Sequence, residues 1–167
     1  MSARFLLFCT TLLACLSLQS SPVAANDIDL TKAVVIGNGP KKVIEFTDPD
    51  CPFCRKASKY FELRNDVTKY VFFMPLAKHP EAKRKAQYIL SQTDRAKAYH
   101  EVMSGKLDNA DTRKLVITPK GVKLQEQQNE IAKAAKIDAT PTFMIMGRII
   151  EGFELVKIEE LLGKQQK

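Results

Sequence analysis

The stretch FTDPDCPFC, residues 46–54, places Cys51 and Cys54 three positions apart, where an apolar segment gives way to a run of helix-forming residues. The apolar segment predicts a strand that ends near Thr47, and Pro52 suits the first position of a helix. Cys51 is then expected at the helix N-cap, where unpaired backbone N–H groups and the helix dipole favour a thiolate. Cys54 follows at i+3 on the same face, and we expect it to be the more buried sulfur.

This arrangement predicts dithiol–disulfide chemistry with a separate role for each sulfur. Cys51 would attack or be attacked in a mixed disulfide, and Cys54 would resolve it. A bond that closes so short a loop removes little chain entropy, so a purely structural disulfide is the weaker interpretation. Arg55 adds positive charge beside the pair, whereas Asp48 and Asp50 act in the opposite direction.

Metal binding is the main alternative use of such a pair. Zinc needs four ligands, and the only histidines are His79 and His100, each of which we expect on a surface helix. A copper(I) carrier could add a methionine such as Met144 or Met146, although both are expected in a strand core. A c-type haem motif would need histidine at position 55, which is arginine. We therefore predict no metal and no other cofactor, and the metal content of the purified reduced protein tests this.

Residues 1–25 have the pattern of a cleavable secretory signal peptide. Arg4 is followed by an uncharged apolar stretch over 5–18 and then by small residues before position 26. This stretch is shorter than the roughly 20 apolar residues of a transmembrane helix. The segment ending at Cys15 loosely resembles a lipobox, so lipoprotein processing there is an alternative. We rank it lower, because the apolar run continues past Cys15.

The expected mature chain, residues 26–167, has the size of one domain. Cys9 and Cys15 leave with the leader, so one closely spaced cysteine pair remains in an exported protein. Arg4 is the only charge in the leader, so 25 basic residues stand against 19 acidic ones, a net charge of +6. No basic stripe interleaved with aromatic residues accompanies this excess, and we expect no nucleic-acid partner.

The hydrophobic pattern predicts an α/β domain of order β-β-α-β, a helical block, then β-β-α. Strands are expected at 33–36, 42–47, 70–74, 143–146 and 149–150, and helices after Pro52, in two pieces within 80–104, at 124–137 and at 155–162. Gly147-Arg148 is expected to form a two-residue hairpin turn. This order matches a thioredoxin fold, a central mixed sheet flanked by helices, with a helical insertion at about 80–137.

Glu45 is an acidic residue inside an otherwise apolar strand, six positions before Cys51. Facing the core behind the cysteines, its carboxyl group could take a proton from Cys54 during exchange. Strand alternation favours the other orientation, in which Glu45 shares a solvent face with Val43, opposite Ile44.

Pro141 lies at the start of a predicted strand, within the segment Ala139-Thr140-Pro141-Thr142. A proline there removes a backbone donor, and it is a natural place for a cis X–Pro bond. A cis Pro141 would present the Thr140 backbone to an extended substrate segment, as in strand addition. An ordinary trans proline is the alternative.

Residues 46–54, together with 139–142, resemble the thioredoxin-like catalytic domain of the bacterial periplasmic DsbC/DsbG disulfide isomerases, over residues 33–163. The resemblance implies that Cys51 is the nucleophile, that Cys54 resolves, and that Thr140-Pro141 is a cis-proline loop facing them. It also implies an acidic residue at Glu45. Pro52 and Phe53 resemble the dipeptides of that family, and the Phe53 ring would add an apolar surface beside Cys51.

The chain departs from that family at its N-terminal end, because only residues 26–32 of the expected mature chain precede the first predicted strand. We therefore expect that it lacks the dimerisation domain of that family. We expect a monomeric periplasmic thiol:disulfide oxidoreductase of reductase or isomerase type. Its partners would be exported cysteine-containing proteins and a membrane redox protein. The alternatives are a periplasmic copper or zinc carrier and a non-catalytic chaperone, the latter tested by whether a double-cysteine variant keeps function.

Overall fold

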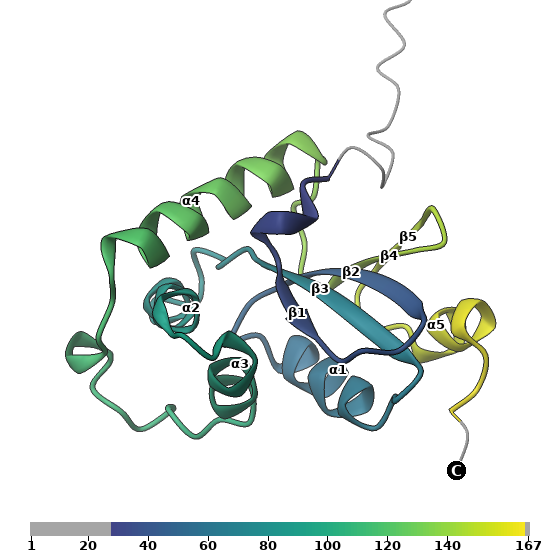
Figure 1. Cartoon of the computed structure of the whole chain (residues 1–167), viewed down its shortest axis with the longest axis horizontal. Helices are drawn as coiled ribbons and strands as arrows, with labels where there is room; N and C mark the ends of the chain where they lie inside the picture. Colours follow the sequence, from purple (N-terminus) through teal and green to yellow (C-terminus); the bar gives the residue numbers. More distant parts are fainter. Residues whose placement is uncertain (1–27, 166–167) are drawn as a thin grey trace, which may run out of the picture.

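The computed structural model describes residues 28–165, which form one five-stranded sheet with helices on both faces (Figure 1). The strands are β1 (Val34–Ile36), β2 (Lys41–Thr47), β3 (Val67–Phe73), β4 (Thr142–Ile145) and β5 (Arg148–Glu151), and they lie in the order β1-β3-β2-β4-β5. Only β2 and β3 run parallel, and the other neighbours are antiparallel. The sheet is therefore mixed, as predicted. The expected leader, residues 1–25, lies outside the described part.

The helices are α1 (Pro52–Glu62), α2 (Ala82–Ser91), α3 (Arg95–Met103), α4 (Pro119–Ala134) and α5 (Leu155–Leu162), with short 3-10 helices η2 (Leu30–Lys32) and η3 (Thr112–Lys114). Helices α2, α3, η3 and α4 lie between β3 and β4, and we call them the helical insertion. The predicted fold class and element order are confirmed. Within residues 28–165 no helix combines the length and apolar character needed to cross a bilayer.

Helix α4 begins five residues earlier than expected. Thr118 caps it, because its hydroxyl accepts a hydrogen bond from the Gly121 N–H at 3.1 Å. Pro119 then occupies the first turn, where its missing N–H costs nothing.

The central strand β2 is covered on both faces. Val43 packs with Ala57 and Phe61 of α1, whereas Phe46 packs with Ala132 of α4. Figure 1 shows α1 and α4 on opposite sides of the sheet. Alternation along β2 therefore separates two buried faces rather than a core face and a solvent face.

The β4–β5 hairpin turns one residue earlier than predicted. Met146 and Gly147 have positive φ angles of 50° and 76°, as a two-residue type I′ turn requires, and Arg148 already belongs to β5. Met144 is buried as expected, but Met146 is 80% exposed at the tip of the turn, so its predicted core position is wrong.

Candidate active site

The two cysteines lie at the start of α1, after the turn that follows β2. Cys51 is the N-cap of α1, with extended backbone angles, and Pro52 follows in the first turn. Cys54 lies in that same turn and is fully buried, whereas Cys51 is 3% exposed. Both are free thiols in this structure. The predicted N-cap position and the deeper burial of Cys54 are confirmed.

The surroundings of Cys51 stabilise its thiolate. A hydrogen bond from Cys54 lowers the pKa of Cys51 to about 5, against the opposing effect of burial. Backbone N–H groups of Cys54 and Phe53 act in the same direction as that hydrogen bond. These donors belong to the unpaired first turn of α1, so the helix start performs the predicted electrostatic role.

The surroundings of Cys54, in contrast, favour its protonated thiol. Burial and the neighbouring Cys51 raise the pKa of the Cys54 thiol far above its ordinary value. The Thr47 hydroxyl and the Asp48 backbone N–H, whose nitrogen lies 3.4 Å from Cys54 Sγ, lower that pKa only in part. Cys54 therefore keeps its proton and donates it to the Cys51 sulfur until another group accepts it.

The segment before β4 faces the cysteine pair. The Thr140–Pro141 peptide bond is cis, and the Thr140 carbonyl oxygen lies 3.6 Å from Cys51 Sγ. Pro141 is buried and Thr140 half-buried. Phe53, by contrast, is 64% exposed. An exposed apolar ring two residues after Cys51 and the Thr140 backbone thus both lie near the nucleophilic position.

Asp48 organises the turn that leads into Cys51. Its buried carboxylate accepts hydrogen bonds from the backbone N–H groups of Asp50 and Leu76, each at 2.7 Å. It also lies 2.9 Å from His79 Nδ1. His79 is half-buried in the turn before α2 rather than on a helix, because Pro80 follows it and disfavours helical angles there. His100 is on α3 as expected, beside Glu62 at 3.1 Å.

Glu45 is fully buried, so the solvent-facing orientation suggested by alternation is wrong. Its Oε2 lies 2.7 Å from Lys69 Nζ, and Lys69 also donates to the Tyr99 hydroxyl at 2.8 Å. All three side chains are buried, and Glu45 Oε1 has no hydrogen-bond partner within residues 28–165. Burial alone would lower the pKa of Lys69, but Glu45 raises it above its ordinary value. Burial raises the pKa of Tyr99 to about 12.

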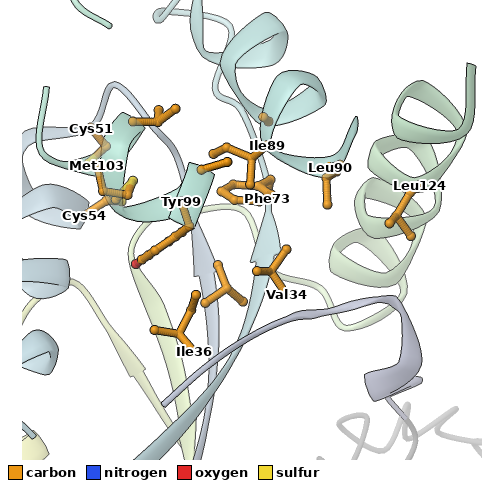
Figure 2. Packing of buried hydrophobic residues seen from close by; sticks show 14 residues of the cluster. Val34, Ile36, Cys51, Cys54, Phe73, Ile89, Leu90, Tyr99, Met103 and Leu124 are labelled. Carbon is orange, nitrogen blue, oxygen red and sulfur yellow. The ribbon is translucent and has the colours of Figure 1, made fainter. Parts of the chain in front are cut away.

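This buried triad of Glu45, Lys69 and Tyr99 lies close to Cys54. Tyr99 and Cys54 belong to the same packed hydrophobic cluster, which Figure 2 shows with both residues labelled. Ser58, four residues after Cys54 on the buried face of α1, approaches the Tyr99 hydroxyl closely enough to affect its pKa. The triad therefore borders, through Tyr99, the packed cluster that contains the cysteine pair.

Sequence reasoning missed several residues that surround the site, namely Lys69 and Tyr99 in the triad, His79 beside Asp48, and Lys85 and Asp108 near Arg55. A lysine inside the apolar strand segment Val67–Phe73 was the one available signal, since such a position needs a buried partner. In the described part of the chain, no group of three or more His, Cys, Asp or Glu side chains is arranged to hold a metal ion.

The chain belongs to the family described as thioredoxin-like domain, which matches residues 28–161. Among solved structures, it is similar to a disulfide interchange protein from Neisseria gonorrhoeae, with 37% identity and a TM-score of 0.69. That match covers 84% of this chain and 99% of the other. The catalytic domain of Proteus mirabilis ScsC shares the fold at 20% identity, with a TM-score of 0.61 and coverage of 80% and 89%.

Among curated proteins, the chain is similar to a probable thiol:disulfide interchange protein DsbC from Bordetella pertussis, with 29% identity over 86 residues. The match covers 52% of this chain and 30% of that protein, so the chain spans less than a third of the length of this relative. Together these relatives confirm the resemblance to a DsbC-type thioredoxin-like catalytic domain.

We expect the Cys51 thiolate to titrate near pH 5 in the reduced protein. The ultraviolet absorbance of the thiolate and the rate of alkylation should both follow this midpoint. Since the Cys54 hydrogen bond is the largest cause, Cys54→Ala should raise the pKa of Cys51, yet leave it below that of an ordinary thiol because the backbone donors remain. A wild-type midpoint above pH 8 would contradict this geometry.

The same titration affects stability with a definite sign. The folded pKa of Cys51 lies below its unfolded value, so the thiolate stabilises the reduced protein fully at pH values above the unfolded pKa. This contribution is lost as the pH falls through about 5.

Proposed function

We propose that this protein is a periplasmic thiol:disulfide oxidoreductase, of reductase or isomerase type, that acts on exported proteins through Cys51 and Cys54. The supporting observation is the opposed character of the two sulfurs. The pKa of Cys51 is lowered to about 5 at a helix start, while its neighbour Cys54 is buried and held protonated. The Cys51 sulfur can thus attack as a thiolate at neutral pH, whereas Cys54 stays protonated until the resolving step.

In the reducing direction, the Cys51 thiolate attacks one sulfur of a substrate disulfide. The substrate S–S bond breaks, a Cys51–substrate disulfide forms, and the second substrate sulfur leaves as a thiolate that takes a proton from solvent. In the second step, Cys54 loses its proton and attacks the Cys51 sulfur. The mixed disulfide breaks, the remaining substrate sulfur leaves, and a Cys51–Cys54 disulfide remains. Two electrons have then passed to the substrate, and the oxidising direction reverses these steps.

Glu45 is the proposed acceptor of the Cys54 proton. It is a buried carboxylate with one oxygen held by Lys69 and the other without a partner in the described residues. A buried acceptor is needed, because bulk water does not reach a fully buried Cys54. Lys69 binds one oxygen of this carboxylate at 2.7 Å, and the Tyr99 hydroxyl accepts a hydrogen bond from Lys69 at 2.8 Å.

Phe53 and Thr140 are the proposed substrate contacts. The exposed Phe53 ring offers apolar contact to an extended substrate segment. The Thr140 backbone lies near enough to the Cys51 sulfur to align a substrate cysteine with it. Pro52 fixes the start of α1 directly after Cys51.

Export to the periplasm is supported by the signal-peptide pattern of residues 1–25 and by relatives named as disulfide interchange proteins. In that compartment the substrates would be exported cysteine-containing proteins, and a membrane redox protein would restore the starting state of the pair. We propose that the protein works as a monomer.

The function is tested by a single-turnover experiment. The fully reduced protein, mixed with an equimolar peptide disulfide, is expected to yield two peptide thiols and one Cys51–Cys54 disulfide, measured by mass spectrometry after acid quenching. Protein alkylated at Cys51 is the control and should yield no peptide thiol. Equilibration with glutathione then gives the direction, since a potential of about −120 mV is typical of an oxidase and about −270 mV of a reductase. Failure to transfer electrons to any peptide disulfide would overturn the proposal.

A further inference from the structure

Four charged side chains connect the cysteine turn to the helical insertion, and the redox mechanism above uses none of them. Asp50 directly precedes Cys51, and Arg55 directly follows Cys54. Lys85 comes from α2, and Asp108 from the loop after α3. Residues 35 to 53 positions apart thus meet beside the active site. We call these four residues the charge clamp.

The clamp is closed by five short contacts. Asp50 Oδ1 accepts from Lys85 Nζ at 2.6 Å and from Arg55 Nη2 at 3.0 Å. Asp108 accepts a two-pronged contact from Arg55, at 2.6 Å on each oxygen, and a third hydrogen bond from Lys85 at 3.1 Å. Each cation therefore bridges the two carboxylates, and the four charges sum to zero.

The Asp50–Lys85 contact of the clamp is largely shielded from water, whereas the Asp108 side chain is 40% exposed. The Lys85 side chain is 5% exposed and that of Asp50 18%. Arg55 and Lys85 hold the pKa of Asp108 down at about 2. Hydrogen bonds of this kind between ionised groups are about twice as strong as neutral ones. The Arg55 Nε also donates to the Pro49 carbonyl oxygen at 2.7 Å, which ties the turn before Cys51 to α1.

Asp50 on its own would oppose the chemistry at the next residue. A carboxylate beside a thiol disfavours the thiolate and raises its pKa. Lys85 and Arg55 bind this carboxylate directly, at 2.6 Å and 3.0 Å, and thereby offset its charge. The other carboxylates near the turn have partners of their own, namely His79 for Asp48 and Lys69 for Glu45.

We infer that the helical insertion is an electrostatic part of the active site: Lys85 neutralises Asp50 and thereby keeps the Cys51 thiolate stable. Lys85 and Asp108 are positioning residues, since they act on Cys51 through Asp50 and Arg55. The inference rests on the proposed redox role of Cys51. It adds that the insertion sets the reactivity of that sulfur and the reduction potential of the pair.

The test compares substitutions of opposite charge within the clamp. Lys85→Met removes a positive charge and should raise the pKa of Cys51 by about one unit, whereas Asp50→Asn removes a negative charge and should lower it. The thiolate absorbance of the reduced protein gives both values. The glutathione equilibrium should move with them, Lys85→Met making the pair more reducing and Asp50→Asn more oxidising. Lys157→Met, which breaks a pair with Glu154 on the distant helix α5, is the matched control and should change neither (Figure 1).

The sign of the shift separates the inference from a purely structural role. If the clamp only braced the turn, both substitutions would loosen it and shift the pKa in the same direction, or not at all, which would overturn the inference. Should Lys85→Met not fold, Asp50→Asn and Asp108→Asn preserve side-chain shape, and each must lower the pKa of Cys51. A raised or unchanged value in either would also overturn it. Because the thiolate titrates without any substrate, absent turnover with opposite shifts would count against the proposed function alone.

Discussion

Replacing Cys54 by alanine is expected to leave the protein covalently joined to its substrates. Cys51 still attacks a substrate disulfide, but the group that resolves the product is gone. Since Cys54 lies directly behind Cys51 in the first turn of α1, no other thiol of the described chain can replace it. Mixed disulfides should accumulate almost completely, whereas the wild-type protein passes through them transiently.

Replacing Cys51 by alanine is expected to abolish turnover rather than to slow it. The remaining thiol, Cys54, is fully buried and has a strongly raised pKa, so it is neither accessible nor ionised at neutral pH. Single-turnover reduction of a peptide disulfide should fall to the uncatalysed background.

Non-reducing electrophoresis of proteins exported with each variant distinguishes the two outcomes. Cys54→Ala should give substrate-linked bands that disappear on reduction, and Cys51→Ala should give none. The double variant is the matched control for non-specific binding. Linked bands from Cys51→Ala would reverse the assigned roles, and turnover by Cys54→Ala at the wild-type rate would remove the resolving role.

The cysteine site could be predicted from the sequence because its causes are local. The N-cap position of Cys51 and the first-turn position of Pro52 depend on residues within one helical turn. The cis bond before Pro141 was implied by the family resemblance, whereas the local sequence also allowed a trans proline. These features need no knowledge of which strands are neighbours.

The burial of Glu45 could not be predicted from its neighbours in the sequence. The alternation argument assumes that one face of the strand is exposed to solvent. However, β2 is the central strand of the sheet and is covered by α1 on one side and by α4 on the other. Its partner Lys69 lies beside it only because β2 and β3 pair in parallel, with Glu45 opposite Val71 and Lys69 two residues away on the same face. The third member, Tyr99, comes from the insertion. Neither Lys69 nor Tyr99 is close to Glu45 in the sequence.

The charge clamp could not be predicted from the sequence either, because its members also come from distant parts of the chain. The opposing charges of Asp50 and Arg55 are visible in the sequence, but the residues that decide their balance, Lys85 and Asp108, arrive through the folding of α2 and the loop after α3. Net charge near a motif therefore predicts little until the tertiary partners of each charge are known.

Lys69→Met is expected to cause a large loss of stability. It removes the partner of Glu45 and leaves a fully buried carboxylate without its counter-charge. Breaking one side of a buried ion pair costs about 3–5 kcal/mol, and the Tyr99 hydroxyl loses its partner as well. The midpoint of urea unfolding, followed by circular dichroism at neutral pH, measures this loss. Lys157→Met, which breaks an exposed pair, should change it by less than about 1 kcal/mol.

At Glu45, Lys69 and Tyr99, the effect on stability can be separated from the effect on the resolution of the mixed disulfide. Buried ion pairs replaced by apolar residues of similar size are often no less stable than the original. The combination Glu45→Leu, Lys69→Met and Tyr99→Phe should therefore regain most of the stability that Lys69→Met alone loses. Resolution of a preformed Cys51–substrate disulfide by Cys54, however, should stay slower than in the wild type by about 10²-fold, because the proton acceptor is gone.

Glu45→Gln completes the argument, because it keeps the shape of the side chain and removes only its basicity. It should slow resolution as much as the triple replacement does, while the first attack by Cys51 keeps its rate. Quenched-flow mass spectrometry resolves the two steps. If Glu45→Gln resolved mixed disulfides at the wild-type rate, the triad would serve the fold alone. A slower resolution step with an unchanged first attack is what a proton acceptor behind Cys54 predicts.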